Sequence, residues 1–177
     1  SLSAVVLAAG AGRRFGGDKL IVPYEGRPLI AGALCAALAA PVVEVVVAVP
    51  SLADPVAEAV RAFSDESRLR LVEVPDRDEG MAASLRAAIR ALDPKSAGVL
   101  VFLGDMPRIP HGVAPALATA LSSDALAAQP AYEGKPGHPV LFARALYPQL
   151  LSLAGDQGAK QVLAGLGERL LRLPIDD

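Results

Sequence analysis

Aromatic residues, cysteine and long apolar runs are all scarce in this chain of 177 residues. Aromatic side chains make up 4% of it, tryptophan is absent, and 17 Lys and Arg stand against 19 Asp and Glu, for a net charge of −2. A surface that binds nucleic acid needs a basic patch with stacking rings, so this composition argues against a nucleic-acid partner. Any phosphate ligand must instead be held by a few placed groups.

The single cysteine, Cys35, cannot form an internal disulfide, and its Ala/Leu-rich surroundings predict a small buried core residue. Two histidines and no CxxC pair leave little room for structural zinc. The longest charge-free run, residues 29–43, is interrupted by Pro41 and is shorter than the ~20 residues of a membrane span. The apolar N-terminus precedes Arg13 and Arg14, which is the reverse of a signal peptide. We therefore expect a soluble, cytoplasmic protein without a membrane partner.

Short β-rich runs alternate with helical patterns along the whole chain. Strands are expected at residues 4–7, 42–49, 69–74, 99–103, 126–130, 140–142 and 170–173. Helices are expected at residues 28–40, 55–63, 81–92 and 113–121, with two more before the last strand. This βαβ rhythm predicts an α/β protein with three α/β/α layers and a mostly parallel sheet. At about 100–200 residues per domain, we expect one domain over residues 1–177.

The helix expected at residues 81–92 has a clear apolar stripe. Its apolar side chains recur at i+4 and i+3 spacing and are Met81, Leu85, Ile89 and Leu92. Arg86 and Arg90 fall off this stripe, and we expect them to form a solvated face.

A glycine-rich segment, LAAGAGRRFGGDKL at residues 7–20, follows the first strand. The dinucleotide fingerprint G-x-G-x-x-G begins at Gly10 and Gly12 but meets Phe15 where the third glycine belongs. A Walker A loop fails as well, because Asp18 stands where its lysine is required. Small residues nevertheless let backbone N–H groups approach an anion, so the segment remains a candidate phosphate loop.

Charged side chains accompany this loop and the end of a second buried strand. Arg14 and Lys19 add positive charge to the loop, and Asp105 follows the strand at residues 99–103 and one glycine. The carboxyl ends of parallel strands open onto one crevice, so we expect these groups to share a cleft. Mg²⁺ binds through one or two carboxylates plus substrate phosphates, which makes Asp105 a candidate ligand. A ligand-free basic loop and a simple turn or N-cap aspartate stay open as alternatives.

Five segments, taken in order, resemble the MobA-like nucleotidyltransferase family, and within it most resemble the molybdenum cofactor cytidylyltransferases. They are LAAGAGRRFGGDKL (7–20), EGMAASLRAAI (79–89), LGDMP (103–107), GHPVLF (137–142) and GDQGAK (155–160). The resemblance implies a Rossmann-like, mostly parallel sheet of the nucleotidyltransferase type. It also implies a Mg²⁺-dependent transfer of CMP from CTP to the terminal phosphate of molybdopterin, with release of pyrophosphate.

The same resemblance assigns roles to individual residues. Arg14 and Lys19 match the family's basic pair and form the catalytic set with Asp105, which would also bind the metal. The residues matched to nucleotide binding are Leu7, Ala8, Ala9, Gly10, Gly12, Arg14, Lys19 and Ser84. His138 and Asp156 match positions on the acceptor side of the cleft.

Both acceptor-side residues also have a purely structural interpretation. His138 would then satisfy loop carbonyls, and Asp156 would be the N-cap of the last helix. We assign no general base, because a phosphate monoester is already a competent nucleophile. The protein need only align it with the α-phosphorus and stabilise charge on the leaving pyrophosphate.

Base choice can be argued from one methyl group. Guanylyltransferase relatives have LAGG where this chain has LAAG, so Ala9 would crowd the base pocket and favour a pyrimidine. We expect a preference for CTP, and we expect Ala9→Gly to relax it toward GTP.

Two rival functions remain. The chain could be a related nucleotidyltransferase that uses GTP or another phosphorylated acceptor, or a non-catalytic molybdopterin carrier. Lys19 and Asp105 speak against a carrier, which needs neither a metal nor a leaving-group stabiliser. The resemblance implies CTP and molybdopterin cofactor as substrates, with a molybdoenzyme or its maturation factor as protein partner.

Relatives continue past the final strand into a segment that helps complete the metal side of the site. The sequence given ends at Asp177, so we assign no second metal ligand.

Overall fold

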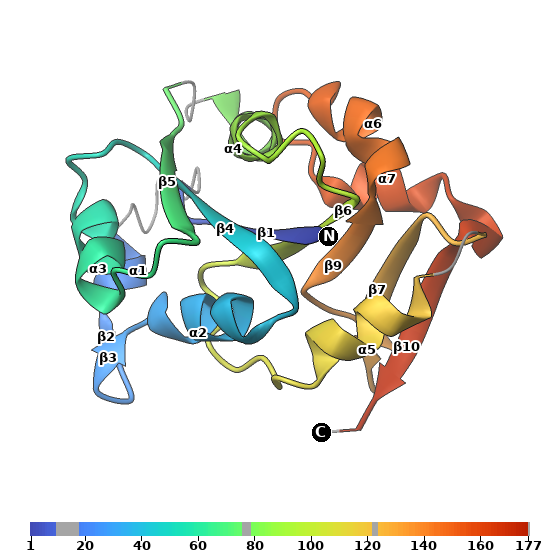
Figure 1. Ribbon diagram of the computed structural model, residues 1–177, viewed down its shortest axis with the longest axis horizontal. Helices are drawn as coiled ribbons and strands as arrows, with labels where there is room; N and C mark the ends of the chain where they lie inside the picture. Colours follow the sequence, from blue (N-terminus) through green and yellow to red (C-terminus); the bar gives the residue numbers. More distant parts are fainter. Residues whose placement is uncertain (10–17, 76–78, 122–123, 177) are drawn as a thin grey trace.

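One mixed sheet forms the centre of the computed structural model, which describes residues 1–9, 18–75, 79–121 and 124–176 (Figure 1). Within these residues the strand order is β10-β7-β9-β6-β1-β4-β5, and β8 pairs with β7 outside this path. The strands of the sheet are β1 (Leu2–Leu7), β4 (Val42–Val49), β5 (Leu69–Glu73), β6 (Gly98–Leu103), β7 (Ala127–Tyr132), β8 (Lys135–Pro136), β9 (Val140–Ala143) and β10 (Leu170–Ile175).

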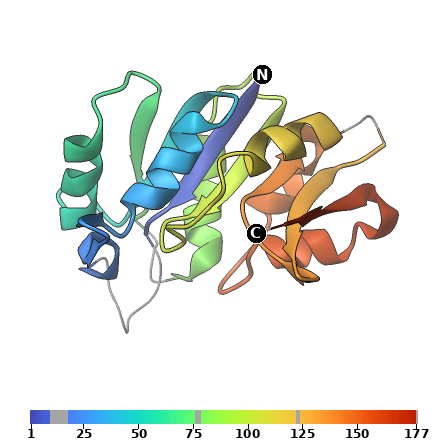
Figure 2. The same cartoon turned by 90° about the horizontal axis from the view of Figure 1, so that it is seen from below.

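Helices cover both faces of this sheet (Figure 1). One layer contains α1 (Asp18–Ile21), α2 (Ala31–Ala39), α3 (Pro55–Phe63) and α5 (Val113–Ala120), and Figure 2 views the molecule from the side of α2 and α5. The other contains α4 (Met81–Arg90), η2 (Arg144–Leu146), α6 (Tyr147–Leu151) and α7 (Ala159–Ala164), and η3 (Gly167–Arg169) precedes β10. Each layer packs on the sheet through its own cluster of buried apolar side chains. The expected three-layer α/β/α fold is confirmed.

The central strands are parallel, because β1 pairs in parallel with both β4 and β6, and β4 with β5. Their near-continuous Val and Leu runs suit strands that are covered on both faces. No helix in the described ranges is long and apolar enough to cross a membrane.

Strand β9 breaks the parallel pattern, since it pairs antiparallel with both β6 and β7. Val140 at the start of β9 lies opposite Val101 near the end of β6. The residues just before β9, including His138, are therefore brought to the edge of the sheet where β1 and β6 end.

The first helix after the glycine segment begins later than the sequence predicts. Pro28 is not a first helical residue, because it lies in β3 (Arg27–Pro28), which pairs with β2 (Pro23–Tyr24). The turn between them has positive φ at Glu25 and Gly26, 52° and 83°, as in a two-residue hairpin turn. Helix α2 starts only at Ala31, and Cys35 within it is half-buried rather than a fully buried core residue.

A buried polar network ties the strands together at their opposite ends. Glu44 at the start of β4 is 7% exposed. Its carboxylate accepts hydrogen bonds from the Ser3 hydroxyl at 2.6 Å, the Asp93 backbone N–H at 2.7 Å and the Arg70 guanidinium at 2.6 Å. The Ser3 hydroxyl also lies 3.0 Å from the Ser96 hydroxyl. Four chain segments, namely β1, β4, β5 and residues 93–96, are thereby joined at the edge remote from the carboxyl ends of β1 and β6.

Candidate functional site

Lys19 and Asp105 lie together at the carboxyl ends of β1 and β6. The Lys19 Nζ is 4.0 Å from the Asp105 Oδ2, and the two side chains are 41% and 48% exposed. Gly104 makes this close arrangement possible, because its N–H donates to the Leu7 carbonyl at 3.0 Å and a Cβ would lie 3.0 Å from the same oxygen. Lys19 and Asp105, which the sequence selects from separate segments, therefore lie together at one edge of the sheet.

Part of the predicted nucleotide site lies outside the described residues, namely Gly10, Gly12 and Arg14. The described part is tightly packed. Ala8 donates its backbone N–H to the Ala48 carbonyl at 2.8 Å, and Ala9 has no exposed surface. Ser84 on α4 is 3% exposed. The nucleotide-binding roles of these residues stay predictions.

Arg108 links the segment after Asp105 to the hairpin that follows Lys19. Its Nε donates to the Tyr24 hydroxyl at 2.6 Å, and its guanidinium pairs with the Glu25 carboxylate at 2.9 Å. A Cβ at Gly32 would lie 2.2 Å from the Pro107 carbonyl, so α2 approaches the same segment as closely as backbone atoms allow. These contacts fix the segment after Asp105 against α2 and against the hairpin that follows α1.

His138 reaches the same edge from the other direction, through the reversed strand β9. Burial lowers the pKa of its imidazole from the usual 6.5, and the neighbouring Asp105 carboxylate opposes this shift. The ring is therefore mainly neutral near pH 7, with one N–H donor and one acceptor nitrogen. No side-chain hydrogen bond of this ring is formed within the described part of the chain. The ring is thus available to a ligand, although its acceptor-binding role stays a prediction.

Asp156 lies in the loop before α7, against the N-terminus of α4. It is not a helix N-cap, because Gly158 caps α7 and its N–H donates to the Gln161 side chain at 2.8 Å. Gly80 has φ of 121°, and a Cβ there would lie 2.6 Å from the Asp156 Oδ1 and 2.4 Å from the Gly155 carbonyl. The loop that carries Asp156 therefore packs directly on the backbone of Gly80, and no side chain lies between them.

The expected solvated face of α4 is wrong at Arg86, whose side chain is only 14% exposed. Its guanidinium donates to the Leu153 carbonyl at 2.7 Å and pairs with the Glu79 carboxylate at 2.9 Å. The arginine thus connects α4 to the start of the loop that carries Asp156.

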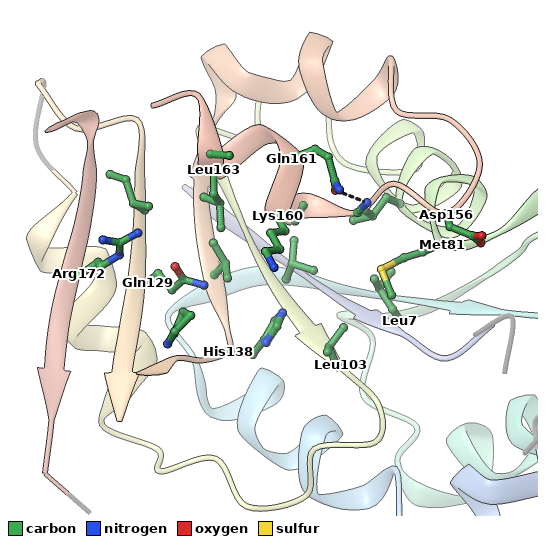
Figure 3. Close-up of a pocket in the computed structure, with 18 residues that line it drawn as sticks. Leu7, Met81, Leu103, Gln129, His138, Asp156, Lys160, Gln161, Leu163 and Arg172 are labelled. Atoms are coloured by element: carbon green, nitrogen blue, oxygen red, sulfur yellow. Dashed lines mark hydrogen bonds between the residues drawn. The ribbon is translucent and has the colours of Figure 1, made fainter. Parts of the chain in front are cut away.

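A cavity of about 560 Å³ lies between the sheet and the helices α4 and α7 (Figure 3). Most of its walls are apolar, and the polar side chains among them are Gln129, His138, Asp156, Lys160, Gln161 and Arg172. The predicted residues Leu7, His138 and Asp156 line it, whereas Ser84 does not. A cavity of this size with few convergent polar groups is typical of a small-molecule site.

Comparison with known proteins places this geometry in a family. The MobA-like NTP transferase domain matches residues 4–171. The chain belongs to this family. It is similar to nicotine blue oxidoreductase from Paenarthrobacter nicotinovorans, with 30% identity over 177 residues that cover 92% of this chain and 81% of that protein.

Solved structures agree with this family membership. Rv0371c from Mycobacterium tuberculosis H37Rv superposes with a TM-score of 0.82 at 27% identity, covering 99% of this chain and 88% of that one. The manganese complex of Rv0371c gives a TM-score of 0.78 at 26% identity over the same shares. A nucleotidyl transferase from Methanothermobacter thermautotroptrophicus, Mth528, gives 0.81 at 25% identity, again over 99% and 88%. The chain is a nucleotidyltransferase of the MobA-like family, and the resemblance seen in its sequence is confirmed at that level.

A divalent cation fits the donor set of this nucleotidyltransferase only together with its substrate. Within the described ranges, no group of three or more His, Cys, Asp and Glu side chains could hold a metal ion. Asp105 offers one carboxylate, half exposed and beside Lys19. This suits Mg²⁺, which commonly binds one or two carboxylates and completes its shell with substrate phosphates and water.

Sequence reasoning missed four polar residues of the cavity: Gln129, Lys160, Gln161 and Arg172. Lys160 ends the GDQGAK segment, and that position was the available signal for it. Arg172 and Leu170 share one face of β10 by strand alternation, and both line the cavity. Neither the motif position of Lys160 nor the strand alternation of Arg172 shows which face of the sheet borders a cavity.

Proposed function

We propose that this MobA-like nucleotidyltransferase transfers CMP from CTP to the terminal phosphate of molybdopterin, with Mg²⁺ bound at Asp105. The observation that carries the proposal is the Lys19–Asp105 pair, 4.0 Å apart, at the end of β6 beside the cavity that Leu7, Leu103 and His138 line. A metal-bound triphosphate needs a carboxylate and a cation side by side, and an organic acceptor needs an adjoining apolar pocket.

The reaction asks the protein for alignment and charge stabilisation. An oxygen of the acceptor phosphate forms a bond to the α-phosphorus of CTP. The bond from that phosphorus to the bridging oxygen breaks, and pyrophosphate leaves with the electron pair. Lys19 stabilises the negative charge that grows on the leaving group. Mg²⁺ supplies further neutralisation of phosphate charge when it is bound at the Asp105 carboxylate.

His138 is suited to orienting the acceptor and not to neutralising it. Its ring is mainly neutral, since burial lowers the pKa, so it offers a hydrogen bond without a full charge. Such a donor can position an acceptor phosphate close to the Asp105 end of the cavity. No proton has to be removed from that phosphate, which agrees with the lack of an assigned general base.

The decisive experiment measures pyrophosphate release from each of the four NTPs, with and without molybdopterin. We expect release only from CTP with molybdopterin and Mg²⁺ present. Lys19→Met should slow it about 100-fold, in line with the loss of one transition-state donor. Lys95→Met, a change at an exposed lysine near the far edge of the sheet, should leave it unchanged.

Each other outcome would replace the proposal with a definite alternative. Release from GTP would change the base, and release only with a sugar or polyol phosphate would change the acceptor. Molybdopterin binding with no release from any NTP would indicate a carrier. The 30% identical relative is named an oxidoreductase, but the dinucleotide fingerprint fails here at Phe15. Redox turnover without pyrophosphate release would favour that relative's activity.

A further inference from the structure

The cavity runs across the strands instead of along them. It is lined from β1 by Leu7, from β6 by Val101 and Leu103, from β9 by Val140, from β7 by Gln129 and from β10 by Leu170 and Arg172. These strands are consecutive in the sheet, so the lining extends over four strand spacings, about 19 Å. Helices α4 and α7 cover it. One molecule or two separate groups can therefore occupy different parts of the same slot.

The two ends of this slot differ in polarity. Over β1 and β6 the lining is apolar, with Leu7, Val101 and Leu103 from the strands and Met81 from α4. At the other end, Arg172 comes from β10, and Lys160 comes from α7. Figure 3 shows the amino end of Lys160 turned toward the part of the cavity near His138 and Gln129.

In the described ranges, no acidic partner balances these two cations. Among the described residues, neither Lys160 nor Arg172 forms an ion pair. Of the lining residues that the structure describes, Asp156 alone carries a carboxylate, and Figure 3 places it at the opposite end, beyond Met81. Both residues are exposed, so their charges lie at the rim of the cavity. Two like charges there repel each other and together attract an anion to the adjoining cavity.

We infer that the acceptor carries a second anionic group, distinct from the phosphate that attacks CTP, and that Lys160 and Arg172 bind it. This inference rests on the proposed function, which places the attacking phosphate at the Lys19 and Asp105 end. The substrate class is therefore an elongated organic phosphate with a further anionic oxygen or sulfur group. The dithiolene of molybdopterin meets this description, and a simple polyol monophosphate does not.

The test compares acceptors that differ only in the second anion. Native molybdopterin and molybdopterin alkylated on both sulfurs to neutral thioethers are assayed for pyrophosphate release with CTP. The variants are Lys160→Met, Arg172→Met and the double variant, since methionine keeps an unbranched apolar stem. Matched controls are Lys135→Met and Arg169→Met, which change exposed cations outside the cavity lining. Thermal midpoints confirm that all variants fold.

We expect the double variant to raise the KM for native molybdopterin about 10-fold or more, with kcat and the KM for CTP within about 2-fold of the wild type. The wild type should prefer the native over the alkylated acceptor, and the double variant should lose that preference. Unchanged KM values or an unchanged preference would overturn the inference while leaving the proposed function intact. If the wild type uses a different phosphorylated acceptor, the proposed function fails. A higher KM for that acceptor in the variants would then support the inference, and an unchanged KM would overturn it.

Discussion

In the proposed function, the metal ion is bound by the Asp105 carboxylate. Asp105→Asn keeps the shape of the side chain but replaces an anionic oxygen with a neutral amide, which is a poor Mg²⁺ ligand. We expect kcat to fall about 100-fold or more, with the thermal midpoint unchanged because the carboxylate is 48% exposed. Pyrophosphate release during a Mg²⁺ titration measures the effect. Asp124→Asn, at an exposed turn, is the control, and full turnover of Asp105→Asn at saturating Mg²⁺ would refute the metal assignment.

Ala9 tests base choice with one methyl group. Ala9 is fully buried, and it belongs to the apolar cluster beneath α4. If the methyl also borders the base, Ala9→Gly should shift the ratio of kcat/KM for CTP and GTP about 10-fold toward GTP, because one carbon atom in a pocket is worth that much. Ala48→Gly removes a methyl from the same cluster and should change stability alone. An unchanged ratio in Ala9→Gly would make its methyl a core group only.

The sequence was sufficient to predict residues at strand ends and insufficient for residues on helix faces. Lys19 and Asp105 could be paired because each follows a buried parallel strand, and such strands end at a common edge. Arg86 was assigned to solvent because helical periodicity measures only its distance from the apolar stripe. Periodicity cannot show that the loop after α6 covers the side of α4 that carries Arg86. Lys160 was not assigned for the same reason, because its contacts depend on tertiary packing.

The contact between α4 and the loop before α7 depends on the absence of a side chain at Gly80. Gly80→Ala would place a Cβ 2.4 Å from the Gly155 carbonyl and would also strain a backbone with φ of 121°. We expect the loop carrying Asp156 to move away from α4, so that the KM for the acceptor rises about 10-fold or more while the KM for CTP changes less. Steady-state kinetics with each substrate varied in turn measure this.

The control for Gly80→Ala must separate loop displacement from backbone strain. Gly134 in the β7–β8 turn also has positive φ, 80°, but no atom lies within 4 Å of the position that a Cβ would take there. Gly134→Ala should therefore lower the thermal midpoint without changing either KM. An equal rise of the acceptor KM in both variants would mean that strain alone, and not the packing of the loop, affects the cavity.

Among the elements, long apolar strands were predicted well and short polar ones were not. The strand at residues 42–49 agrees with β4, because eight consecutive residues that are nearly all apolar have no other stable place than a covered sheet. The β2–β3 hairpin was missed, because its paired strands have two residues each and both contain proline. Its geometry comes from the Glu25–Gly26 turn and the Arg108 contacts, and neither gives a periodic signal.

At the scale of the whole molecule, the buried Glu44 network and the Lys19–Asp105 pair lie at opposite edges of the sheet. Burial alone would raise the pKa of Glu44, but the hydrogen bonds from Ser3, the Asp93 backbone and Arg70 outweigh it and lower the pKa below the ordinary 4.5. The folded protein therefore binds this proton less readily than the unfolded chain. The stabilising contribution is present above pH 4.5 and is lost as the pH falls through the lower folded-state pKa.

Glu44→Gln is expected to reduce the free energy of unfolding by about 2 kcal/mol at pH 7, because hydrogen bonds to a buried charge are replaced by weaker ones. Its loss of stability on acidification below pH 4.5 should be smaller than that of the wild type. Urea unfolding across this pH range measures both effects, and Glu133→Gln at an exposed turn is the control. If the free energy of unfolding falls equally with pH in the wild type and in Glu44→Gln, protonation of Glu44 does not contribute to the acid sensitivity.

The reversal of β9 has a consequence for how such a molecule can diversify. Lys19 and Asp105 follow strands β1 and β6, whereas His138 precedes a strand that enters the sheet from the opposite direction. Lys160 and Arg172 belong to the chain after that strand. Under the proposed function, the two sides of the site are thus encoded in separate stretches of sequence. Substitutions after residue 130 would then change the acceptor that receives the nucleotide, while the residues proposed to bind the triphosphate stay the same.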